Sequence, residues 1–157
     1  MARRSFADIE KIWSNVEGIK KLSDRAVGFG PFGVGLDGLL TWIPVVGTAY
    51  SVGTSAWLLL QATRAKASPG TIVRMVGLLG FDTAATATGE VIPLGPDLID
   101  FFFRGHLMAA NALQRDIETT HWVEARERDA RASGDHERHV ATMRADPNKR
   151  RLVYLHD

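Results

Sequence analysis

The chain has 157 residues with no cysteine, 45% apolar and 24% charged residues, and a formal net charge of +1. This length suits a single domain. The lack of cysteine excludes disulfides, thiol nucleophiles and thiolate zinc sites, and the balanced charge argues against a dedicated nucleic-acid-binding protein. The charges are unevenly placed, because residues 38–113 carry only four basic and four acidic side chains. The chain therefore divides into a polar start, an apolar glycine-rich centre and a highly charged tail.

Residues 1–27 are predicted to form an amphipathic helix. Apolar residues recur at steps of three and four from Phe6 to Ile19, and Ser5 followed by Asp8 resembles a capping box. The segment has no apolar core of the kind that a signal peptide needs. Its apolar face could pack on the rest of the protein or lie on a membrane surface, and the sequence leaves both alternatives open.

The longest uncharged segment comprises the 26 residues from 38 to 63. About 20 mostly apolar residues cross a bilayer as a helix, so this segment is long enough. Pro44 predicts a kink or break, because proline lacks an N–H and clashes with the preceding turn. The segment is one kinked membrane-spanning helix, two shorter helices meeting at Pro44–Gly47, or a buried hairpin of a soluble helical protein. We favour membrane insertion or association.

The centre contains an internal repeat with a period of about 45 residues. Each copy has a Gly-x-Asp step, an Ile-Pro step and a long apolar helix, the first over residues 35–64 and the second over residues 71–114. Two copies are too few for a solenoid, so we predict tandem helical hairpins, each broken by proline and glycine. The structural positions of the repeat are Asp37, Pro44, Gly47, Pro93 and Pro96.

Both copies contribute to a longer pattern: Gly35-Leu36-Asp37, Ile43-Pro44-Val45-Val46-Gly47, Asp82, Ile92-Pro93, and Asp97 to Arg104. This pattern, over roughly residues 20–115, resembles the bacterial family of unknown function called DUF4112. The resemblance implies a small helical membrane or membrane-associated protein and supplies no catalytic residues. The chain departs from the family pattern at Thr48, where the family usually has Asp.

A few polar residues inside the apolar centre are candidates for a binding site. On a helix that starts near Pro96, the residues at offsets of three and seven from Asp97 share one stripe. Ionisable groups at membrane depth cost about 2.5–3.5 kcal/mol on insertion scales, so they usually face a partner or water. One alternative is that the polar residues of this stripe bind an ion, a headgroup or a partner helix. The other alternative, which we favour, is that they form a helix cap and an intrahelical ion pair. The candidate contact residues are Asp82, Asp97, Asp100, Arg104 and Asn111.

The sequence contains no recognisable catalytic or metal-binding motif. His136 and His139 are three residues apart, whereas the zinc motif His-Glu-x-x-His needs a spacing of four. Neither a nucleophile elbow nor a phosphate-binding glycine loop occurs. We therefore expect no catalysis, no metal and no cofactor.

Residues 115–157 are predicted to be a polar helical tail that is partly extended. Alternating Glu and Arg residues favour a solvated helix that ends at Gly134. Its apolar residues Ile117, Trp122 and Val123 are too few for a strong core contact. Beyond the glycine we expect loose structure.

The sequence predicts an all-α single domain of membrane-associated helical hairpins, over residues 1–157. We expect a non-enzymatic membrane protein that acts as a scaffold or accessory subunit of a larger membrane complex. The alternatives are ion or small-molecule permeation along the buried charged residues, and a soluble helical interaction domain. The expected partners are membrane lipid and membrane protein subunits or a second copy, without nucleic acid. The resemblance implies a bacterial inner membrane location, and the basic segments at both ends predict that both termini are cytoplasmic. The central loop is also basic, so two membrane spans and two re-entrant hairpins both stay open.

Overall fold

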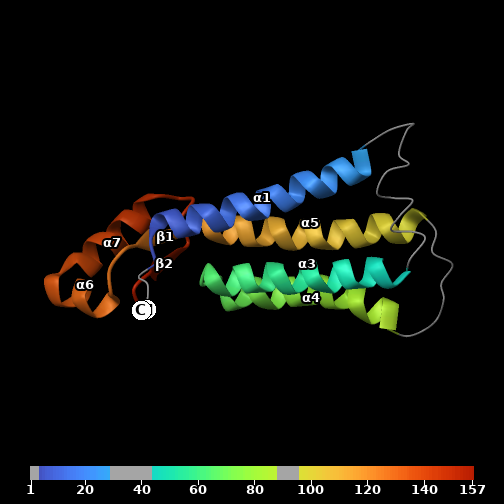
Figure 1. Ribbon diagram of the computed structural model, residues 1–157. Coiled ribbons are helices and arrows are strands. Elements are labelled where there is room, and N and C mark those ends of the chain that lie inside the picture. Colours follow the sequence, from blue (N-terminus) through green and yellow to red (C-terminus); the bar gives the residue numbers. More distant parts are fainter. Residues whose placement is uncertain (1–3, 29–43, 88–95) are drawn as a thin grey trace.

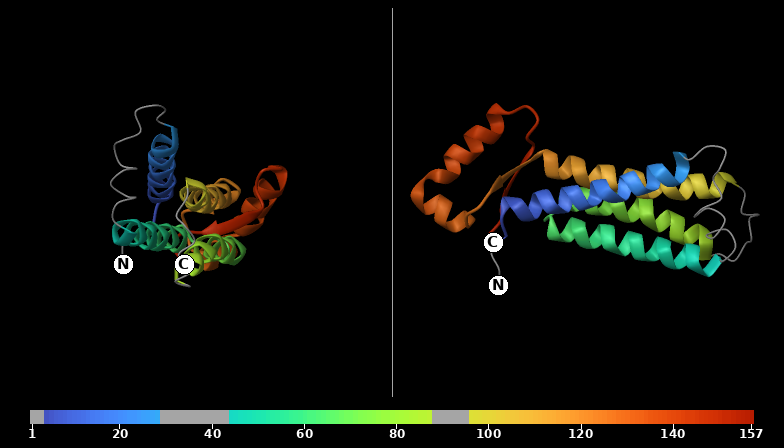
Figure 2. Two further views of the ribbon diagram at one scale, coloured as in Figure 1. Left: turned by 90° about the vertical axis from the view of Figure 1, so that its right-hand side faces the viewer. Right: turned by 45° about the horizontal axis from the view of Figure 1, so that its top comes forward.

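In its described residues the protein is a bundle of four helices with a small unit of helices and strands at one end (Figure 1). The computed structural model describes residues 4–28, 44–87 and 96–157, and their side chains over residues 4–21, 52–80 and 105–157. The helices of the bundle are α1 (Phe6–Gly28), α3 (Pro44–Arg64), α4 (Pro69–Ala87) and α5 (Pro96–Glu118). Seen along the bundle, α1 and α5 form one layer and α3 and α4 form the other (Figure 2). The predominance of helix confirms the predicted helical class.

The main core lies between these two layers. The largest fully buried side chains of the bundle come one from each helix: Val16, Leu58, Met75 and Leu113. Full burial of such a side chain is worth about 1.5–3 kcal/mol relative to exposure. Helix α5 contacts each of the other three helices, so it is the central element of the bundle.

Helix α1 packs its apolar stripe on the protein. Ile9, Ile12 and Val16 are buried in the main core, which decides between the two alternatives that the sequence left open. The predicted capping box is also confirmed, because the Ser5 N–H donates to the Asp8 carboxylate at 2.8 Å and the Asp8 N–H donates to the Ser5 hydroxyl at 3.4 Å. The hydrogen bond from the Ser5 N–H lowers the pKa of Asp8.

Two of the predicted helix breakers stand at helix starts. Pro44 is the first residue of α3 and Pro96 is the first residue of α5, where the missing N–H of proline has no intrahelical partner to lose. Gly47 lies inside α3, and the repeat positions Asp37 and Pro93 lie outside the described residues.

The helices of the described segments are too short or too polar to cross a bilayer. The membrane-spanning helix predicted over residues 38–63 is therefore not found in the described part of that segment, which begins at Pro44. The physical reason is that the Thr, Ser and Gln side chains of α3 lower its mean hydropathy below that of a membrane-spanning helix.

The C-terminal unit, residues 119–157, contains a parallel pair of strands joined by two short helices. The strands are β1 (Thr120–Val123) and β2 (Arg151–Tyr154), and the helices are α6 (Glu127–Ser133) and α7 (Asp135–Ala145). Thr120 lies opposite Arg151 and Val123 lies opposite Tyr154. A small core of Val123, Ala130 and Tyr154 holds the unit together, and Leu155 is buried in the main core.

This unit corrects the prediction for the tail. The single helix expected over residues 114–134 is interrupted: α5 ends at Glu118, and a strand follows because Thr119–Val123 is rich in β-branched and aromatic residues. The predicted helix end at Gly134 is confirmed, because α6 ends there. The region expected to be loose forms α7 and β2. Ile117 and Val123, which were expected to make only a weak core contact, are buried in the main core and the small core.

Gly134 joins the two short helices and provides a first test of the fold. It ends α6 with φ of 80°, a left-handed conformation that costs a residue with a Cβ about 1 kcal/mol. Gly134→Ala is expected to lower the free energy of unfolding by about 1 kcal/mol, measured by urea denaturation. Gly18→Ala is the matched control, because Gly18 lies in the middle of α1 with open space around it and alanine favours helix there. Equal effects of the two changes would contradict the assigned backbone conformation at Gly134.

Candidate association face

Helices α3 and α4 each expose apolar side chains at the surface. The exposed fractions are 49% for Val52 and 48% for Leu60 on α3, and 71% for Val73 and 49% for Val76 on α4. Single exposed apolar residues are ordinary in proteins. Here they recur at helical spacing, because Val52 and Leu60 are eight residues apart with the exposed Ala56 between them.

Small residues accompany these apolar side chains. A Cβ added at Gly53, Gly77 or Gly80 would meet nothing within 4 Å, so these glycines are open to the surroundings. Glycine and alanine on a helix surface let the backbone of another helix approach closely. We define the association face as Val52, Gly53, Ala56, Leu60, Val73, Val76, Gly77 and Gly80.

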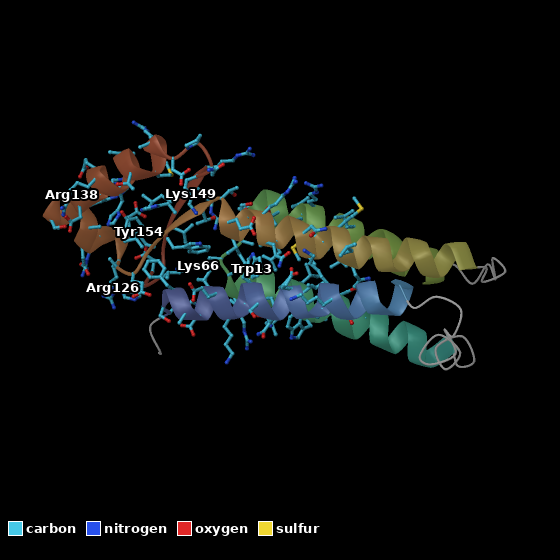
Figure 3. All side chains as sticks on the ribbon, turned by 90° about the horizontal axis from the view of Figure 1, so that it is seen from above. Trp13, Lys66, Arg126, Arg138, Lys149 and Tyr154 are labelled. Carbon is cyan, nitrogen blue, oxygen red and sulfur yellow. The ribbon has the colours of Figure 1, made fainter. Side chains whose placement is uncertain are left out.

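The charged residues of the segment that carries the association face, residues 52–80, are all basic. Between residues 52 and 80 the charged residues are Arg64, Lys66 and Arg74, which lie in or near the turn between α3 and α4. Lys66 lies at the junction with the C-terminal unit (Figure 3). Its ammonium group donates to the carbonyl oxygens of Tyr154 at 2.8 Å and Asp157 at 2.9 Å, and burial lowers its pKa. The segment that carries the face thus has three basic and no acidic residues.

The carboxylate of Asp116, near the end of α5, fixes the start of α4. Ser68 donates to it through its N–H at 2.9 Å and its hydroxyl at 2.7 Å, and the Thr71 hydroxyl donates at 3.0 Å. Arg151 of β2 approaches the same carboxylate at 3.2 Å. A guanidinium N–H of Arg151 also donates to the Lys66 carbonyl. We call this arrangement the Asp116 clasp, and it joins α4, α5 and β2.

Local sequence prepares α4 for the Asp116 clasp. The Ser68 hydroxyl accepts a hydrogen bond from the Thr71 N–H at 3.2 Å, as an N-cap residue does, and Pro69 occupies the first helical position. Ser68-Pro69 is therefore a signal in the sequence that could have located this helix start. Nothing local identifies Asp116 as its partner, because the two residues are 48 positions apart.

A buried polar contact also joins α3 to α5. The Ser55 hydroxyl and His106 Nε2 are 3.0 Å apart, and His106 is only 3% exposed. Serine beside histidine is a combination used in nucleophilic catalysis. Because the imidazole is enclosed between helices, we interpret the contact as a hydrogen bond that positions α3 against α5.

A shallow hollow of about 330 Å³ lies between α1 and the end of α5. Its walls are mainly apolar and include Trp13, which is labelled in Figure 3, and Trp122. The Trp13 indole N–H donates to Glu118 at 3.0 Å and the Trp122 indole N–H donates to the Ile117 carbonyl at 3.1 Å. Both rings are therefore held in place by the protein itself.

The contact residues predicted from the sequence are only partly placed by the structure. The side chains of Asp82, Asp97, Asp100 and Arg104 lie outside the described residues, and so does the predicted permeation path. Asn111 is described, and it lies exposed on α5. The association face and the Asp116 clasp were not predicted as sites.

Comparison with known proteins now places the chain in a family. The family described as Domain of unknown function (DUF4112) matches residues 12–117. The chain belongs to this family. Neither the curated proteins nor the solved structures contain a match.

The DUF4112 match coincides with the helical bundle. It begins within α1 at Ile12 and ends at Ile117, one residue before the end of α5. The association face and Asp116 lie inside the matched region, whereas Arg151 lies beyond it. The Asp116 clasp therefore joins the family bundle to the C-terminal unit.

The Asp116 clasp predicts a large effect of one substitution. Asp116→Ala removes the acceptor of three donors and leaves Arg151 without its carboxylate, so we expect a loss of about 2–4 kcal/mol in the free energy of unfolding. The matched control is Asp129→Ala on α6, an exposed acid whose pairing with Arg128 is expected to contribute less than about 0.5 kcal/mol. Urea denaturation of both variants measures the difference, and equal stabilities would refute the role of Asp116.

Proposed function

We propose that the protein acts by association, as a non-enzymatic scaffold or accessory subunit of a larger membrane protein complex. The observation that carries this proposal is the association face, which leaves Val52, Leu60, Val73 and Val76 exposed at helical spacing. Contiguous exposed apolar residues on a folded protein mark surfaces that bind other proteins or membranes.

The composition of the association face favours a helix as the partner. Open glycines at positions 53, 77 and 80 lie beside branched apolar side chains, and this mixture lets two helices pack at short distance. Leu60 and Val73 then offer side chains that fill the grooves of a neighbouring helix. The partner is therefore expected to present a helix with an apolar surface of its own.

The distribution of charge supports a partner at a membrane. No acidic residue occurs between residues 52 and 80, and the basic residues of that segment gather towards the end of the bundle that carries the polar C-terminal unit. Basic residues beside apolar segments favour the cytoplasmic side of a membrane, whose lipids are anionic. In this arrangement both termini and the C-terminal unit lie on the cytoplasmic side.

Site-specific crosslinking tests this proposal. A photoreactive amino acid at position 76 replaces Val76 in the centre of the association face, and the same group at position 141 replaces the exposed Ala141 of α7 as a control. After expression in the native host, position 76 is expected to give one discrete adduct with a membrane protein, and position 141 is expected to give none. The same adducts from both positions, or none from position 76, would overturn the proposal.

A second prediction concerns the binding energy of the association face. The double change Val73→Asp and Val76→Asp places two carboxylates in an interface that excludes water, where an unpaired charge costs several kcal/mol. We expect the membrane-bound fraction to fall by about tenfold or more, corresponding to about 1.4 kcal/mol. The control is Ala132→Asp with Ala141→Asp, which adds the same charges to exposed positions of the C-terminal unit. Fractionation of gently lysed cells measures the outcome, and equal fractions for both variants would speak against the face.

A further inference from the structure

The C-terminal unit brings three histidines and a tyrosine together. His121 is on β1, His136 and His139 are on α7, and Tyr154 is on β2 inside the unit (Figure 3). The ring centres of His121 and His139 are 5.6 Å apart, and those of His136 and Tyr154 are 6.0 Å apart.

The structure separates the two histidines that are close in sequence. His136 Nδ1 lies 2.9 Å from the Tyr154 hydroxyl, so this histidine is engaged with β2. His139 Nδ1 faces a different partner, Nε2 of His121, at 3.4 Å. The pairing of His121 with His139 joins residues 18 positions apart and could not be read from the motif His-Glu-Arg-His.

The distance between the two facing nitrogens has the value that a tetrahedral metal ion requires. At 3.4 Å the contact between His121 and His139 is a long hydrogen bond, and the two facing nitrogens are far enough apart to bind one ion together. Zinc binds histidine nitrogen at about 2.0–2.1 Å, and two ligands of a tetrahedral ion at that length are about 3.4 Å apart. The distance between the two nitrogens therefore matches the distance between two ligands of a tetrahedral zinc ion.

Water would supply the remaining ligands of an ion bound by this pair. Both imidazoles are partly exposed at the surface of the unit. No group of three His, Cys, Asp or Glu residues in the described segments has the arrangement of a metal site. Two imidazoles with two waters form an open coordination sphere, unlike the closed four-ligand sites of structural zinc.

We propose that His121 and His139 form a two-histidine site for a divalent transition metal such as Zn²⁺. The imidazoles come from β1 and α7, so one bound ion links the strand to the helix that packs beside it. A ligand that binds the folded state alone raises its stability. The metal thus stabilises the C-terminal unit that β1, α7 and β2 form beyond the DUF4112 bundle.

Titration of the full chain with Zn²⁺ tests the site. Isothermal titration calorimetry at neutral pH is expected to show one ion bound per chain, and thermal unfolding is expected to shift upward with added Zn²⁺. His121→Gln and His139→Gln are each expected to weaken binding by at least about tenfold, which corresponds to about 1.4 kcal/mol. Circular dichroism of both variants verifies that the helices remain folded.

Two controls separate this pair from other histidines. His136→Gln is expected to keep the Zn²⁺ affinity, because His136 contacts Tyr154 and not the proposed ion. His156→Gln, at the C-terminal end, is expected to keep it as well. Cu²⁺ bound to the full chain should show coupling to two imidazole nitrogens in its electron paramagnetic resonance spectrum. Absence of binding, or binding that survives His121→Gln and His139→Gln, would overturn the proposal.

Discussion

The carboxylate of Asp116 accepts hydrogen bonds from the start of α4 and from β2. Asp116 lies near the end of α5, where the chain passes into the C-terminal unit. Its position depends on α5, which packs against every other helix of the bundle. Ser68 and Thr71 set where α4 begins, and Arg151 sets where β2 returns to the bundle. Hydrogen bonds to a carboxylate that is largely removed from water are strong, because a buried donor left without its acceptor would lower the free energy of unfolding. Asp116 is therefore one of the residues that join the layer of α3 and α4 to the C-terminal unit, together with Lys66 and Leu155.

The association face is a consequence of this arrangement. Helices α3 and α4 are apolar on more than one side, and over residues 52–80 packing within the bundle buries the sides that carry Leu58 and Met75. Val73, on the outer side of α4, has no such neighbour. The high apolar content of α3 and α4 therefore produces both the core and the surface for which we propose a partner.

The C-terminal unit gives this DUF4112 member a second, smaller structure. It lies beyond the matched region, has its own core around Tyr154 and is tied to the bundle by Leu155 and Lys66. The His121–His139 pair belongs to this unit and not to the family bundle. Any property of that pair is thus specific to chains that carry the same extension.

The sequence by itself determined the helical class, the amphipathic α1 with its Ser5–Asp8 cap, a break at Pro44, a helix that starts near Pro96, and the family. These features depend on local periodicity and on the backbone restrictions of single residues, which the sequence displays directly. Tertiary structure decided that α1 packs on α5, that Thr119–Val123 becomes a strand, and that Asp116 meets Ser68. Those outcomes depend on contacts between residues far apart in the chain, and a local pattern specifies which side chains are able to pair but not which of them meet.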